Sequence, residues 1–141
     1  MCLKKQQLDV EPDLEFLLFG LVSSQKASKV CFFLNQIANL NLERVEDFKL
    51  PDYNPASKTS FSKFAFSDEE NHLLFSVLAN KEFGLCLFSD LKQFDFLLIL
   101  RGGLEFFDPK KFIEDLRVVD DIQLLVEIEN DKIKSKLSWI V

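Results

Sequence analysis

A chain of 141 residues with 48% hydrophobic and 28% charged residues has the composition of one globular domain, which excludes an intrinsically disordered protein. Its formal net charge of −6, from 17 basic and 23 acidic residues, argues against general binding to nucleic acids or anionic membranes, because both depend on neutralising phosphates. Phenylalanine dominates the aromatic residues, with 16 Phe against one Tyr and one Trp, so we expect most rings in the core and a minority in a surface patch.

The cysteines and the apolar runs indicate a cellular compartment. Cys2, Cys31 and Cys86 are far apart and form no CxxC motif, so neither a disulfide framework nor a zinc site is indicated, and no cofactor is predicted. The first 13 residues lack the hydrophobic region of a signal peptide, and the longest apolar runs are far shorter than the roughly 20 residues of a membrane span. We therefore expect a cytoplasmic protein without a membrane segment.

The N-terminal third predicts a strand followed by a helix. Residues 15–22 lack alternation and are rich in β-formers, which is typical of a strand buried on both faces. Ser23 and Ser24 are candidate caps for a helix over 24–40, which Asn39 or Asn41 would end in a left-handed conformation. Phe32 and Phe33 widen its apolar stripe. The stripe itself consists of Ala27, Val30, Cys31, Leu34, Ile37 and Ala38.

Several strands are predicted in the middle of the chain. Residues 42–50 have the mixed polarity of a partly exposed strand, and the loop at 51–60 is rich in Pro, Asn and Ser. Residues 61–66 and 72–79 flank the acidic stretch SDEEN and predict a hairpin, and FGLCLF at 83–88 predicts a further short strand.

The stretch FDFLLIL at 94–100 predicts a strand that ends at the turn-forming Arg101-Gly102-Gly103. Alternation places Phe94, Phe96, Leu98 and Leu100 on one face, and Asp95, Leu97 and Ile99 on the other. Asp95 is a carboxylate inside an apolar strand. It must therefore be exposed at a sheet edge or satisfied by a partner.

The C-terminal third begins with a helix start at Asp108-Pro109, which predicts a helix over 108–119. Residues 122–129 then alternate, with Ile122, Leu124, Val126 and Ile128 inward. The tail from 131 alternates again and predicts a last strand. Its lysines, Lys132, Lys134 and Lys136, would share one face, followed by Trp139. The whole pattern predicts a single α+β domain over 1–141, with a mainly antiparallel sheet of about six strands packed by two helices.

No catalytic or metal-binding constellation emerges from these elements. A phosphate loop needs glycines that open directly onto a helix, whereas LEFF follows Gly103, so a simple turn is the better interpretation. His72 is the only histidine, and it borders a predicted hairpin turn. The lysine row and Trp139 suit an acidic protein partner, and they equally suit the protection of an edge strand from unwanted pairing.

Three stretches of the chain, LNQIANLNLERVEDFKL, FSDLKQFDFLLIL and IENDKIKSKLSWIV, together resemble the bacterial IPExxxDY family. Phe88-Ser89-Asp90 stands at the position of Ile-Pro-Glu, and Asp95-Phe96 stands at the position of Asp-Tyr. Four residues separate the two parts where the family name implies three, proline is absent, and phenylalanine replaces the tyrosine. The resemblance implies a small cytoplasmic protein without an assigned activity, and it draws attention to Asp90, Asp95 and Phe96.

Two functions are consistent with these observations. The first is a non-enzymatic protein-interaction or adaptor module, because no acid–base pair, metal set or nucleophile arrangement stands out. The second is a small-ligand sensor with a Phe-lined pocket between the helix at 24–40 and the sheet. A flat apolar patch would favour the first, and a pocket rimmed by polar groups would favour the second.

Overall fold

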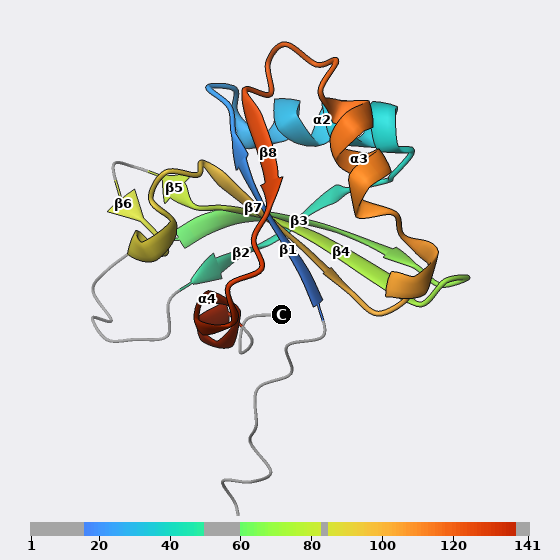
Figure 1. Cartoon of the computed structure of the whole chain (residues 1–141). Helices are drawn as coiled ribbons and strands as arrows, with labels where there is room; N and C mark the ends of the chain where they lie inside the picture. Colours follow the sequence, from blue (N-terminus) through green and yellow to red (C-terminus); the bar gives the residue numbers. More distant parts are fainter. Residues whose placement is uncertain (1–15, 50–59, 83–84, 138–141) are drawn as a thin grey trace, which may run out of the picture.

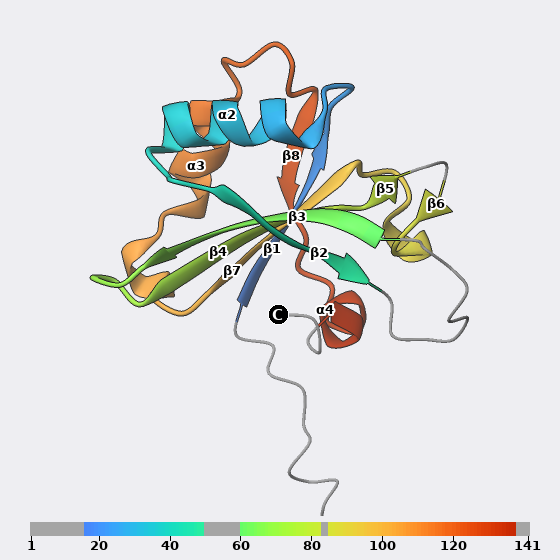
Figure 2. The same cartoon turned by 180° about the vertical axis from the view of Figure 1, so that it is seen from behind.

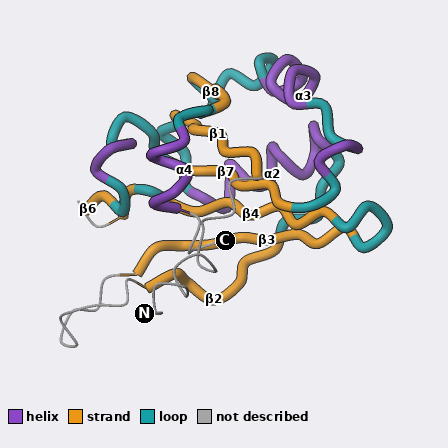
Figure 3. Tube along the Cα trace, turned by 60° about the horizontal axis from the view of Figure 1, so that its bottom comes forward, coloured by secondary structure: helices purple, strands orange, loops and turns teal. Residues whose placement is uncertain are grey.

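The run FLLFGLV, predicted to be buried on both sides, forms a strand in the interior of an antiparallel sheet (Figure 1). The computed structural model describes residues 16–49, 60–82 and 85–137, and within these ranges the sheet has six strands in the order β2-β3-β4-β7-β1-β8. Figure 3 shows β2 at one edge and β8 at the other. The strands of this sheet are β1 (Phe16–Val22), β2 (Glu43–Lys49), β3 (Ser60–Asp68), β4 (Leu73–Ala79), β7 (Phe96–Arg101) and β8 (Leu124–Glu127). The predicted α+β class is confirmed.

Two helices, α2 (Ala27–Ala38) and α3 (Pro109–Leu116), pack against each other and cover one face of this sheet, hereafter the helical face (Figures 1 and 2). Both lie within the ranges predicted for helices. Asn39 ends α2 in the left-handed region at φ 58°, as expected for one of the two candidate asparagines. The Asp108 carboxylate begins α3 by accepting the backbone N–H of Lys110 at 3.1 Å and of Lys111 at 3.2 Å.

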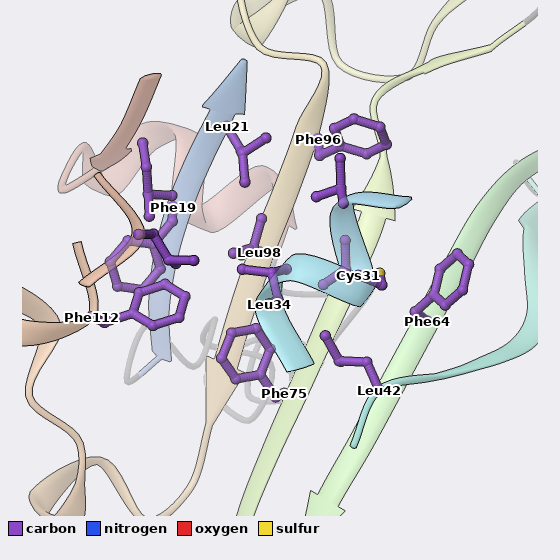
Figure 4. Close-up of a cluster of buried hydrophobic side chains, with 14 of the residues drawn as sticks. Phe19, Leu21, Cys31, Leu34, Leu42, Phe64, Phe75, Phe96, Leu98 and Phe112 are labelled. Atoms are coloured by element: carbon purple, nitrogen blue, oxygen red, sulfur yellow. The ribbon is translucent and has the colours of Figure 1, made fainter. Parts of the chain in front are cut away.

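Alternation along the strands sends every second side chain into a core between the sheet and these helices. Figure 4 shows Leu34 and Cys31 of α2 pointing onto Phe75 and Leu98 of the strands. Phe112 of α3 meets other rings edge to face, with centroids 5.3 Å from Phe19 and 5.7 Å from Phe75. The predicted faces of β7 are confirmed here, because its even-numbered residues join this core and its odd-numbered residues do not.

The opposite face, hereafter the loop face, is covered by residues 87–94 and by a C-terminal helix, α4 (Asp131–Leu137). The covering segment includes the 3₁₀ turn η1 (Ser89–Leu91). Phe94, predicted on the same side as Phe96, precedes β7 and packs on the loop face instead. Its ring lies against β1 at Gly20, where a Cβ atom would be only 2.5 Å from the ring. Glycine at this position therefore permits the close approach.

The two glycines after β7 form the turn that the sequence predicts. Gly102 and Gly103 have φ of 76° and 50°, a region that favours glycine. A short 3₁₀ turn, η2 (Leu104–Phe106), follows before α3. Within the predicted strand FGLCLF, Leu85–Cys86 form β6, which pairs with β5 (Lys81–Glu82) in a separate two-stranded sheet, and Phe83 and Gly84 lie outside the described residues.

The prediction of a strand from residue 131 was wrong, because Asp131–Leu137 is helical. The Asn130 side chain accepts the backbone N–H groups of Lys132 at 2.9 Å and of Ile133 at 3.3 Å, which is how a capping residue starts a helix. Alternation over seven residues was too short a pattern to distinguish the two structures.

The inward set predicted for 122–129 was also wrong in part. Leu124 is 46% exposed, whereas Leu125 is buried in the helical-face core. Val126 and Ile128 pack on the loop face, and Ile122 packs on the helical face. β8 has covering groups on both sides, so its apolar residues do not follow a single inward face.

Candidate functional site

Asp95 lies at the end of the loop-face covering segment, directly before β7. Its carboxylate accepts the backbone N–H of Ser23 at 3.0 Å and lies 3.4 Å from the ammonium of Lys81. Its backbone N–H donates to Leu21 O at 2.9 Å. Of the two environments expected for this carboxylate, satisfaction by partners is the one observed. Asp95 thus joins β1, β5 and the start of β7.

Asn80 is the buried polar residue that organises this region, and the sequence analysis missed it. The residue is fully buried, and its side-chain amide donates to Leu91 O at 2.9 Å and to Phe94 O at 3.0 Å. Its side-chain oxygen accepts the N–H of Phe88 at 3.0 Å. These three bonds hold the segment 88–94 over the loop face. An asparagine after an apolar strand is a common turn signal, so sequence alone offered no sign of this role.

Ser23 and Asp121 extend the same region towards the other end of the chain. The Ser23 hydroxyl donates to Asp121 O at 2.7 Å and accepts the N–H of Gln25 at 3.1 Å. Ser23 therefore fixes the turn before α2 rather than capping the helix, whose N-cap is Lys26. Ser23, Asn80, Lys81, Asp95 and Asp121 are named here the polar junction. The bonds above engage the Ser23 hydroxyl, the Asn80 amide and both Asp95 oxygens, so we assign the junction a structural role.

The residues highlighted by the family resemblance do not come together in one site. Asp90 lies in η1 and is exposed, and Asp95 belongs to the polar junction. Phe96 is buried in the core on the helical face, on the opposite side of the sheet from the segment that carries Asp90. The Phe96 ring is held by hydrophobic packing, and this packing does not need the hydroxyl group of the tyrosine that stands at this position in the IPExxxDY signature.

The three lysines of the predicted C-terminal row do not share a face. Because α4 is a helix, Lys132 and Lys134, which are two positions apart, lie on different sides of it. The ammonium of Lys134 lies 5.1 Å from the centroid of the buried Phe16 ring, and the guanidinium of Arg101 lies 5.3 Å from the same centroid. The Lys136 side chain and Trp139 lie outside the described residues.

Within residues 16–49, 60–82 and 85–137, no three His, Cys, Asp or Glu side chains come together to hold a metal ion. His72 is exposed in the β3–β4 turn at φ 55°. Burial raises the pKa of the Cys31 thiol to about 12, so this cysteine stays a protonated core residue.

The solvent side of α2 carries an exposed aromatic ring beside a basic residue. Phe32 is 53% exposed, and its ring meets that of Phe33 edge to face at 5.9 Å. The ammonium of Lys29 lies 5.5 Å from the Phe32 centroid and 5.4 Å from the Phe33 centroid. With Lys26, these residues are named the basic aromatic surface. The sequence analysis placed Phe32 and Phe33 on the flanks of the apolar stripe, but the lysine contact needed the helix geometry.

Comparison of the chain with family models, with curated proteins and with solved structures found no match. Among the described residues, no helix is long and apolar enough to cross a membrane.

Proposed function

We propose that this protein is a non-enzymatic interaction module, and that the basic aromatic surface of α2 is where its protein partner binds. The observation that carries the proposal is the exposure of Phe32, with 53% of its surface in water although its helix is firmly packed beneath it. Aromatic side chains, phenylalanine included, are enriched at protein interfaces, because a ring offers a large area at a low conformational-entropy cost.

A small-ligand sensor with a pocket between α2 and the sheet has less support. Val30, Cys31 and Leu34 of α2 are at most 2% exposed, and they fill the space between the helix and the strands. The phenylalanines of this region pack against one another and against these side chains, as Figure 4 illustrates. The arrangement resembles a completed core more than a cavity lining.

A cytoplasmic location and kinship with the IPExxxDY family are part of the same proposal. The free thiols of Cys31 and Cys86 suit a reducing compartment. The three matching stretches, which occur in order along the chain, support the kinship.

The test is affinity purification from the native cytoplasm with wild-type protein, Phe32→Ser and a matched control, Leu74→Ser. Leu74 is 41% exposed, and alternation puts it on the loop face because its neighbour Phe75 belongs to the helical-face core. We expect the control to retain the co-purifying proteins and Phe32→Ser to lose them. Recovery of the same proteins by Phe32→Ser would contradict the assigned surface, and a small molecule released on denaturation would favour the sensor.

A further inference from the structure

The surroundings of α2 differ in charge from the rest of the chain. Residues 23–42 contain Lys26 and Lys29 and no Asp or Glu, although the chain has 23 acidic residues and a net charge of −6. The whole of the net negative charge therefore lies outside this segment. Lys26 is the N-cap of α2 and Lys29 lies in its first turn, so both lysines stand at the start of this helix.

The two lysines are not neutralised by the described part of the chain. The ion pairs found there join Arg44 to Asp47, Lys81 to Asp95 and Lys111 to Asp115, and none includes Lys26 or Lys29. Both lysine side chains are exposed. Their ammonium groups can therefore meet an incoming carboxylate without first breaking an internal pair.

The position of Lys29 ties this charge to the exposed rings. Its ammonium lies within 5.5 Å of both ring centroids, so one binding group would contact cation and aromatic ring together. A carboxylate near Lys29 and an apolar side chain on Phe32 would then be neighbours in the bound segment. A segment that carries both groups would be bound in preference to others, since a purely acidic or purely apolar segment would contact only half of the basic aromatic surface.

We infer that the partner bound at the basic aromatic surface is an acidic polypeptide segment with a large apolar side chain next to its carboxylates. This inference rests on the proposed function and adds the chemistry of the partner. A symmetric second copy is disfavoured, because the same surface on that copy, residues 23–42, has no carboxylate to pair with Lys26 and Lys29. Anionic membranes are recognised by clusters of 4–8 basic residues, and this surface has two.

The experiment is selection from a phage-displayed library of random 12-residue peptides on purified wild-type protein. Enriched sequences should combine Asp or Glu with Phe, Trp, Leu or Ile. The affinity of the leading peptide, measured by fluorescence anisotropy, should fall about tenfold for Lys26→Glu/Lys29→Glu, because two exposed ion pairs with the peptide are lost. It should also fall about tenfold for Phe32→Ser, because the apolar contact with the exposed ring is lost. The loss caused by the charge reversal should shrink as salt is raised.

A matched control is Lys92→Glu/Lys110→Glu, which reverses two exposed lysines outside α2 and should leave the peptide affinity unchanged. The inference is overturned if no acidic sequences are enriched, or if the peptide binds the α2 charge reversal as tightly as wild type. It is also overturned if phosphatidylglycerol vesicles bind the protein through Phe32, or if light scattering shows a dimer that Phe32→Ser dissociates.

The same charge-reversed protein separates this inference from the proposed function. If native co-purifying proteins require Phe32 but tolerate Lys26→Glu/Lys29→Glu, the surface is an interface and its partner is not acidic. If the native co-purifying proteins are instead retained by both the charge-reversed protein and Phe32→Ser, the proposed function itself is wrong. Thermal unfolding of every variant checks that the fold is intact.

Discussion

The helical face and the loop face of the sheet are closed by different kinds of interaction. On the helical face, two helices place hydrocarbon against hydrocarbon, with the Phe112 ring packed between Phe19 and Phe75. On the loop face, a segment with one 3₁₀ turn is held by bonds from Asn80 and Asp95 as well as by apolar packing. A short irregular segment leaves backbone groups unpaired, so it needs a buried polar side chain that a helix does not.

The largest expected effect tests the hydrocarbon side of this comparison. Phe75→Ala removes a fully buried ring and its edge-to-face contacts with Phe112 and Phe107. We expect the free energy of unfolding to fall by about 3–5 kcal/mol, measured by urea denaturation. The neighbouring Leu74→Ala, on the loop face and 41% exposed, is the control and should cost about 1 kcal/mol or less. Equal losses from the two changes would contradict the assigned burial.

The next effect tests the polar side. Asn80→Ala leaves two carbonyl groups and the Phe88 N–H without their bonds, and we expect a loss of about 3 kcal/mol. Hydrogen exchange should accelerate over residues 87–95 more than in α2 or α3. Asn80→Asp preserves the shape but, when ionised, cannot donate to Leu91 O and Phe94 O, so it should be similarly destabilising at neutral pH. A fully stable Asn80→Asp protein would argue against this hydrogen-bond network.

A smaller effect concerns how α3 is started on the helical face. Asp108→Ala removes the acceptor for the N–H groups of Lys110 and Lys111, which should cost about 1 kcal/mol. Asp115→Ala breaks an exposed ion pair with Lys111, at 3.0 Å, and should cost less stability than the loss of the cap, because exposed ion pairs contribute little. Urea denaturation of both variants measures the difference. A larger loss of stability from Asp115→Ala than from Asp108→Ala would contradict the expectation that the cap contributes more than the ion pair.

The smallest effect concerns β8, the strand that contributes to both faces. Burial raises the pKa of the Glu127 carboxyl, Glu129 raises it further, and Lys134 lowers it. A raised folded-state pKa means that the protonated carboxyl favours folding, so this contribution is present below the unfolded pKa and is lost as pH rises through the folded pKa. Glu127→Gln should therefore be slightly more stable than wild type at pH 7, with no advantage at pH 3. An advantage that grows on acidification would contradict this sign.

The sequence predicted the hydrocarbon side of the fold better than the polar side. The helix at 24–40 and the alternation of β7 followed from periodicity, because burial of apolar side chains leaves a repeating pattern, and the start at Asp108 followed from its capping signal. The Ser23 N–H that donates to the Asp95 carboxylate is far away in the chain, so no local pattern predicted this bond. The same holds for the role of Asn80.

The candidate site was predicted only in part, for a related reason. Exposed phenylalanine was expected from composition, but which ring is exposed depends on how α2 rotates onto the sheet. The lysine row failed because its interpretation depended on a strand, and Asn130 instead begins a helix there. The capping bonds within residues 130–133 start a helix, although the alternation of residues 131–137 is typical of a strand.

The position of β1 between β7 and β8 has a consequence for how the protein is made. Phe16 pairs with Arg101 and Phe19 pairs with Glu127, so this strand is synthesised long before either of its neighbours. Strand pairings between distant segments form slowly, whereas β3 and β4 are joined by a short turn and can pair early. During translation, FLLFGLV has no strand partner and both its faces are apolar. We expect the emerging N-terminal half to depend on protection by chaperones until residues 96–127 have left the ribosome.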